Sequence, residues 1–234
     1  VWVSSDSRGR YSVVLPKGDV SIYATASING QEAVYLSSVS ATESTTLDLQ
    51  LTDGVVLSGN VQSSGIVVAS ATVRLESRTS GAVFNAVTNA SGGFRAVLPV
   101  DNYFAYIYDQ SRSYWGDINL DASKSLAFNL QTSVRITGRA WFDANGDGAI
   151  STGETLNGVI VAVTDQSGRS VSVSTSSTGY YSMVLVTDKS YTLTANKKGY
   201  DQVLKSYDPL DVSVTADLNM LATERQVSGA VAPG

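Results

Sequence analysis

Residues 143–154, DANGDGAISTGE, have the residue types and spacing of a loop that wraps oxygen atoms around one cation. Oxygen donors stand at positions one, three, five, seven, nine and twelve, namely Asp143, Asn145, Asp147, Ala149 through its carbonyl, Ser151 and Glu154. Gly148 follows at position six, where such a loop turns sharply. Calcium takes six to eight oxygens in twelve-residue loops of this pattern, with a bidentate Glu at the end. The spacing therefore predicts that these six residues bind Ca2+.

The segments on either side of this loop have the pattern of strands. RITGRAWF comes before the loop, and Val159, Val161 and Val163 alternate after it. The alternative interpretation is a turn rich in Asx and Gly that binds no metal. Such a turn needs only one or two of these residues, whereas every position of the calcium loop is filled.

The composition narrows the classes of function. The chain of 234 residues contains no Cys and no His, so thiol chemistry and His-based acid–base catalysis are absent, and zinc, copper or haem would lack their usual ligands. The net charge of −5 disfavours a nucleic-acid partner. No apolar run approaches the roughly 18 residues of a membrane-spanning helix, so we expect no direct membrane insertion. We find no catalytic constellation and predict that the chain is not an enzyme.

An internal repeat organises the chain. A polar turn, a glycine, an aromatic residue and a Val-Leu run recur as DSRGRYSVVLP, NASGGFRAVLP and SSTGYYSMVLV, with their glycines at Gly9, Gly92 and Gly179. Glycine suits a turn that needs a positive φ. Alternate residues of each following strand should face inward: Tyr11, Val13 and Leu15; Phe94, Ala96 and Leu98; Tyr181, Met183 and Leu185.

A second landmark precedes each new unit. It reads VLSGNV at 56–61, RITGRA at 135–140 and QVSGAV at 226–231, and we interpret each as a first strand. The predicted units are the back part of one repeat, a complete repeat, a calcium-binding repeat and the first strand of a further repeat, at 1–54, 55–133, 134–224 and 225–234. We expect an open edge in 1–54, which residues 225–234 of a neighbouring molecule could fill by head-to-tail strand exchange.

The fold class follows from the repeat and the strand patterns. Units of roughly 80–90 residues with frequent turns fit a sandwich of seven strands. We therefore predict an all-β chain of tandem immunoglobulin-like β-sandwich repeats.

Residues 141–168 resemble the calcium-binding B repeats of serine–aspartate-repeat surface adhesins. The matching positions are Trp141, Asp143, Asn145, Asp147, Gly148, Glu154, Leu156, Gly158, Val159, Val161, Asp165 and Gly168. The resemblance implies an extracellular spacer that calcium makes rigid. Related collagen-adhesin B-type domains often carry a Lys–Asn isopeptide bond, but the first strands at 55–61 and 134–140 contain no Lys, so we expect no such bond.

Residues 1–133 lack the acidic loop and more closely resemble carboxypeptidase-regulatory-like, or transthyretin-like, repeats. They share the pattern of a glycine turn, an aromatic residue and a Leu-Pro strand end. This resemblance implies a prealbumin-like sandwich of a kind sometimes grouped as carbohydrate-binding-like.

Two weaker signals concern surface ligands. If Tyr103 faces inward, an aromatic stripe of Phe104, Tyr106 and Tyr108 faces outward, with Trp115 close in sequence. Such rings could stack on a glycan or a surface protein, and the alternative is that they pack against a neighbouring unit or the other sheet. Asn89-Ala90-Ser91 is a glycosylation sequon, which makes Asn89 a candidate glycosylation site.

These observations lead to two hypotheses from different classes. The first is a structural spacer or stalk segment of a large surface protein, of adhesin or surface-layer type, located outside the cell and contacting neighbouring repeats of its own chain. The second is an accessory module of a secreted protein that binds carbohydrate or protein. The aromatic stripe distinguishes them, since only the second hypothesis needs it.

Overall fold

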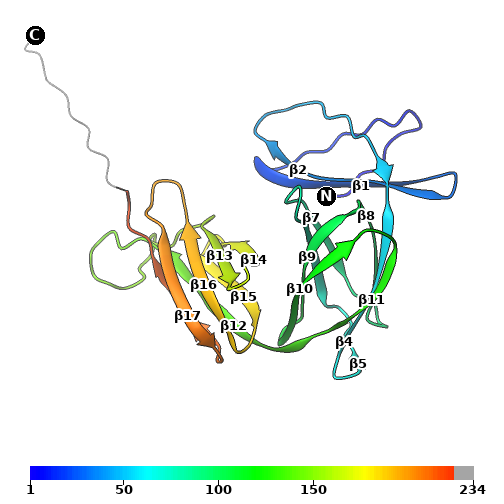
Figure 1. The fold of residues 1–234 in the computed structure, drawn as a ribbon. Helices are drawn as coiled ribbons and strands as arrows, with labels where there is room; N and C mark the ends of the chain where they lie inside the picture. Colours follow the sequence, from blue (N-terminus) through cyan, green and yellow to red (C-terminus); the bar gives the residue numbers. More distant parts are fainter. Residues whose placement is uncertain (224–234) are drawn as a thin grey trace, which may run out of the picture. The chain divides into compact units, whose positions relative to one another are not determined.

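The computed structural model describes residues 1–223, whose regular structure is β-strand throughout (Figure 1), and this confirms the all-β prediction. Residues 224–234, which include the strand expected at 225–234, lie outside the described residues. In the described part, no helix is long and apolar enough to cross a membrane.

The chain divides into two compact units. The first unit contains residues 1–107 and 115–129, and the second contains residues 108–114 and the chain from Leu130 onward. The tip of the hairpin formed by β9 (Asp101–Tyr108) and β10 (Arg112–Leu120) therefore belongs to the second unit. There Arg112 pairs with Thr132 on β12 (Gln131–Trp141).

A three-stranded antiparallel sheet occupies residues 18–53. Its strands are β1 (Gly18–Ile28), β2 (Gln31–Ala41) and β3 (Thr52–Asp53), in that order. The turn between β1 and β2 is Asn29-Gly30, and both residues have positive φ angles, 53° and 81°. An Asn-Gly pair favours this two-residue hairpin because the two residues tolerate left-handed backbone geometry. Val34 of β2 is fully buried.

Residues 55–129 form a sandwich of two sheets. The first sheet contains β4 (Val55–Ser63), β5 (Ile66–Val67), β8 (Gly93–Leu98) and β11 (Lys124–Asn129), and β4 lies between β8 and β11. The second has the order β10-β9-β6-β7, with β6 (Thr72–Ser77) and β7 (Val83–Val87). Fully buried side chains such as Leu57, Leu75 and Ile107 form the core.

The second unit repeats this architecture. One of its sheets places β12 between β15 (Tyr180–Val186), which is antiparallel to it, and the short parallel strands β18 (Val214–Thr215) and β19 (Leu218–Asn219). The other sheet has the order β14-β13-β16-β17, with β13 (Ile160–Asp165), β14 (Ser170–Ser174), β16 (Lys189–Asn196) and β17 (Val203–Leu210). The β-sandwich prediction is confirmed.

The three predicted glycine turns share one geometry. The φ angles of Gly9, Gly92 and Gly179 are 77°, 74° and 71°. In each turn the glycine N–H donates to the carbonyl three residues earlier, at 2.9 Å. At Gly92 and Gly179 the positive φ disfavours a side chain, and a Cβ would also lie 2.6 Å from a backbone oxygen.

The strands after two of these turns follow the predicted alternation. Their inward residues are all buried, namely Phe94, Ala96, Leu98, Tyr181, Met183 and Leu185. The prediction of a strand after Gly9 was wrong, since residues 10–17 form no strand in this structure. Tyr11, Val13 and Leu15 still alternate with more exposed neighbours, but they are only half-buried. The periodicity remains, whereas the ladder of hydrogen bonds that would make a strand is missing.

The two sequence landmarks are partners in the sheets. Gly59 on β4 pairs with Phe94 on β8, and Gly138 on β12 pairs with Tyr181 on β15. A Cβ at Gly59 would lie 1.9 Å from Cε1 of Phe94. Glycine is therefore required under the ring, and each sandwich needs both landmarks at once.

Candidate metal site

The loop at residues 143–154 connects β12 to β13 and is closed at its base by backbone pairing. Phe142 N–H donates to the carbonyl of Glu154 at 2.9 Å, and Trp141 forms an antiparallel bridge with Thr155. The first and last positions of the loop are thus held at one end of the strands. The prediction that strands flank the loop is confirmed.

The carboxylate of Asp143 organises the first half of the loop. Its Oδ1 accepts the N–H of Gly146 at 2.8 Å, and its Oδ2 accepts the N–H of Gly148 at 2.9 Å. Both glycines have positive φ angles, 76° and 74°, so the backbone curls around the carboxylate. This curl points successive backbone groups toward the interior of the loop.

Asn145 and Asp147 continue the same curl. Asp147 N–H donates to Oδ1 of Asn145 at 2.9 Å, and Ala149 N–H donates to Oδ1 of Asp147 at 2.8 Å. Nδ2 of Asn145 also donates to Oδ2 of Asp147 at 2.9 Å. Asn145, Asp147 and Ala149 are exposed, whereas Asp143 and Ser151 are half-buried. The structure thus brings positions three and five into direct contact.

Glu154, at position twelve, is buried, with 6% of its surface exposed. Its Oε1 accepts the N–H of Ala144 at 3.1 Å, and its Oε2 accepts the N–H of Ser151 at 2.9 Å. The carboxylate therefore links the beginning and the end of the loop. No Lys or Arg of the described chain forms an ion pair with it.

Asp165 is the other buried carboxylate in residues 1–223, and its surroundings differ. Its Oδ2 forms an ion pair with Arg169 at 2.7 Å. A buried carboxylate is costly unless a positive charge or several hydrogen-bond donors compensate it. Asp165 has an arginine in that role, whereas Glu154 has only two backbone amides.

The predicted convergence of the loop carboxylates is not formed in this structure. In the described part of the chain, no three acidic side chains gather into a cluster that could hold a metal ion. The physical reason is that Asp143 and Asp147 direct their oxygens to loop amides. The donor set itself fits Ca2+, because it consists only of oxygen atoms from carboxylates, an amide, a hydroxyl and a carbonyl.

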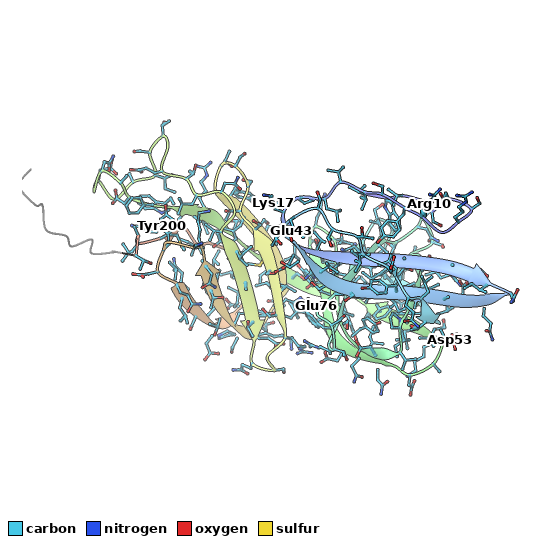
Figure 2. All side chains as sticks on the ribbon, turned by 90° about the horizontal axis from the view of Figure 1, so that it is seen from above. Arg10, Lys17, Glu43, Asp53, Glu76 and Tyr200 are labelled. Carbon is cyan, nitrogen blue, oxygen red and sulfur yellow. The ribbon has the colours of Figure 1, made fainter. Side chains whose placement is uncertain are left out.

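Two contacts of the loop have no signal in the sequence. The Ala144 amide holds Glu154, and a backbone donor cannot be recognised from the residue type. The ring of Phe142 contacts Tyr200 edge to face, with 5.9 Å between centroids. Tyr200 is labelled in Figure 2 and follows β16, so it joins the start of the loop to a distant segment of the same unit.

The aromatic stripe does not form the predicted exposed surface. Phe104, Tyr106 and Trp115 are 1%, 6% and 7% exposed, and only Tyr108 is half-buried. Trp115 makes T-shaped contacts with Phe104 and Tyr106 at 5.5 and 5.6 Å, and the Arg78 guanidinium lies 5.0 Å above the Phe104 ring. The stacking hypothesis was wrong for these three residues, because their faces are covered.

Asn89 lies in the exposed turn that the sequence predicted. Its Oδ1 accepts hydrogen bonds from Ser91 N–H at 2.9 Å and from Gly93 N–H at 2.9 Å. The side chain thus fixes the turn between β7 and β8. Its role as a glycosylation site stays a prediction.

Comparisons with known proteins give weak likenesses. No protein-family model and no curated protein matches the chain. Among solved structures, the Bacillus anthracis TIE protein is 12% identical with a TM-score of 0.33, and the match covers 87% of this chain but only 42% of that one. The shaft pilin SpaA from Lactobacillus rhamnosus GG is 10% identical with a TM-score of 0.33, covering 74% and 99%.

The minor pilin GBS52 from Streptococcus agalactiae is 12% identical with a TM-score of 0.30, covering 76% of this chain and 100% of the pilin. The chain spans less than half of the TIE protein's length. We draw nothing about function from overlays at this level.

Proposed function

We propose that this chain is a non-catalytic spacer segment of a large extracellular surface protein and that Ca2+ bound at residues 143–154 stabilises its second unit. The observation that carries the calcium part is the environment of Glu154. It is a buried carboxylate at the required position of the loop, and no cationic side chain of the described residues pairs with it. A divalent cation would supply the missing positive charge.

The roles of the loop residues follow from their positions. Asp143, Asn145, Asp147 and Glu154 would provide side-chain oxygens, Ala149 its carbonyl, and Ser151 would hold a water molecule. The amide hydrogen bonds already shape the loop backbone around Asp143. Calcium binding would therefore require mainly that side chains rotate toward the ion. Calcium would supply positive charge that neutralises the carboxylates and ties the two ends of the loop together.

The spacer role is supported by the architecture. The chain repeats one sandwich architecture. Its two glycine–aromatic pairs, Gly59 with Phe94 and Gly138 with Tyr181, pack strands together within the sheets. The rival binding-module hypothesis depended on exposed rings at Phe104, Tyr106 and Trp115, and these are buried. We therefore propose neighbouring repeats of the same polypeptide as the main partners.

The test is a comparison of melting temperatures in millimolar calcium and in chelator. Wild type should melt higher in calcium, and Asp143→Ala or Glu154→Gln should abolish the difference because each removes a calcium ligand. Asp211→Ala is a matched control, since it removes an exposed carboxylate outside the loop. Calorimetric titration should find one calcium site in wild type. Identical melting temperatures of wild type in calcium and in chelator would contradict the proposal.

A further inference from the structure

The second unit has an open cavity of about 400 Å³ where β13 begins and β16 ends. Small-molecule sites in proteins have volumes of about 300–1,000 Å³, so the cavity is large enough to hold a small organic ligand. It contains no residue of the loop at 143–154. The lining residues are Gly158, Ile160, Asn196, Lys197, Lys198 and Tyr200.

A tight turn places two lysines at this cavity. Tyr200 N–H donates to the carbonyl of Lys197 at 3.1 Å, which closes a turn of four residues. Gly199 has a φ angle of 90°, as the third position of a type II turn requires. Because the turn follows β16 directly, Lys197 and Lys198 lie beside the last residue of that strand, Asn196.

Lys197 is held in place without being neutralised. Its Nζ donates to the carbonyl of Asn157 at 2.7 Å, and it lies 3.8 Å from the position that a Cβ on Gly158 would occupy. A carbonyl accepts one N–H of an ammonium group but leaves its charge uncompensated. Within residues 1–223, no carboxylate forms an ion pair with Lys197 or Lys198.

Two adjacent cations of this kind are a local exception in a chain whose net charge is −5. Asp201, which follows the turn, does not line the cavity, and its carboxylate accepts the hydroxyl of Thr223 at 3.2 Å. A concave surface lined by uncompensated positive charge attracts anions. The charge of the cavity therefore favours an anionic ligand.

The opposite wall of the cavity is neutral and partly apolar. Ile160 and Asn196 are direct partners in the register of β13 and β16, so their side chains lie together on one face of the sheet. Ile160 is 47% exposed, although its chain neighbours Val159 and Val161 are fully buried. Oδ1 of Asn196 accepts Nε2 of Gln202 at 2.9 Å, which leaves the Nδ2 group of Asn196 to donate to a ligand.

We propose that this cavity binds a saccharide that carries a carboxylate, such as a uronic acid residue. The ammonium groups of Lys197 and Lys198 pair with the carboxylate, and Nδ2 of Asn196 donates to a hydroxyl oxygen. The apolar face of the sugar ring lies against Ile160 and the ring of Tyr200, which already contacts Phe142 edge to face. Inorganic phosphate would match the charge but would leave the apolar wall uncovered.

The first test is a titration of the isotope-labelled chain with sodium glucuronate, followed through the amide NMR signals. Saturable shifts should appear at Gly158, Lys198 and Tyr200. Glucose, which lacks the carboxylate, should bind about tenfold more weakly or less, because it forms no hydrogen bond between charged groups. No shift at these residues, or equal binding of glucose, would overturn the proposal.

The second test uses variants at the cavity. Lys198→Gln should weaken glucuronate binding roughly fivefold, because it removes an exposed charge. Lys189→Gln is the matched control, since it removes an exposed lysine from the opposite end of β16 and should leave binding unchanged. An equal loss in the two variants would show that only the overall charge matters and would overturn the site.

The apolar wall separates a saccharide from an acidic peptide. Ile160→Ser should weaken glucuronate binding, because the face of the sugar ring loses its apolar contact. A tetraglutamate peptide that binds more tightly than glucuronate, and equally well to Ile160→Ser, would assign the cavity to an acidic protein segment and overturn the saccharide.

The cavity and the calcium loop can be tested separately. The titrations are carried out in chelator, so their result does not depend on calcium. Lys198→Gln should retain the calcium-dependent rise in melting temperature, because Lys198 lies outside residues 143–154.

Discussion

Tyr181 and Tyr11 stand at the same point of the repeat, and each hydroxyl donates to a distant backbone carbonyl, yet the surroundings of the two rings differ. Tyr181 is 2% exposed and lies over Gly138 in a sheet with strands on both sides. Tyr11 is half-buried and lies over no strand of the described chain. The comparison shows that the same kind of hydrogen bond can lie within a sheet, as at Tyr181, or between two segments that belong to no strand, as at Tyr11.

The largest expected difference between the regions comes from calcium, since only the second unit contains the acidic loop. A micromolar site in millimolar calcium would stabilise that unit by about 4 kcal/mol. Scanning calorimetry should show one transition that moves upward with calcium while the remainder of the trace stays in place. A uniform shift of every transition would contradict the assignment to residues 143–154.

The second prediction breaks the glycine–tyrosine pair. Gly138→Val should destabilise the second unit by about 3 kcal/mol, because its side chain would collide with backbone atoms of Ala216, which cannot rotate away. Arg139→Val on the same strand is the control, and as an exposed position it should change stability by less than about 0.5 kcal/mol. Urea unfolding measures both, and equal losses would refute the steric explanation.

The third prediction compares the two hydroxyls. Tyr181→Phe should cost about 1.5 kcal/mol, because it leaves the buried carbonyl of Ala216 without this donor. Tyr11→Phe should cost only about 0.5 kcal/mol, since water can reach a half-buried group. Urea unfolding of the two single variants is the measurement. Similar losses of stability would show that the Tyr11 hydrogen bond is as well shielded from water as the Tyr181 hydrogen bond.

The smallest expected effect is at alkaline pH. Burial raises the pKa of Tyr181, as do the charges of Tyr207 and Asp217, and burial also raises the pKa of Tyr11. When the folded state raises the pKa of a tyrosine, the protonated hydroxyl contributes to the free energy of unfolding. This contribution is complete below the unfolded-state pKa of about 10, and it is lost as the pH rises through the folded-state pKa.

Melting temperatures at pH 8 and above pH 10 should therefore fall less in Tyr181→Phe than in wild type. Tyr11→Phe should behave almost like wild type. A wild type with no decline in this range would contradict the burial of the Tyr181 hydroxyl.

Several local features were predictable because their cause lies within a few residues. The glycine turns at Gly92 and Gly179, the inward residues that follow them, and the strands around the loop at residues 143–154 agree with the structure. Each depends on backbone freedom or on the period of two along a strand.

The aromatic residues on β9 show that alternation along a strand does not predict burial. Alternation placed Phe104 and Tyr106 on the face opposite Tyr103, but it could not say whether that face is covered. Arg78 lies in the turn after β6 and Trp115 lies on β10, and their contacts with these rings decide the burial. The same holds at residues 10–17, where the alternation is present but no strand forms, because a strand also needs a hydrogen-bonded neighbour.

The sequence by itself determined the repeat, the turns, the strand faces and the spacing of the loop donors, because these are properties of neighbouring residues. Only the tertiary structure decided that Glu154 is buried without an arginine while Asp165 has one, and that the Tyr11 hydroxyl donates to the distant carbonyl of Leu47. The physical reason is that burial and pairing depend on segments distant in sequence. No local pattern specifies which of them meet.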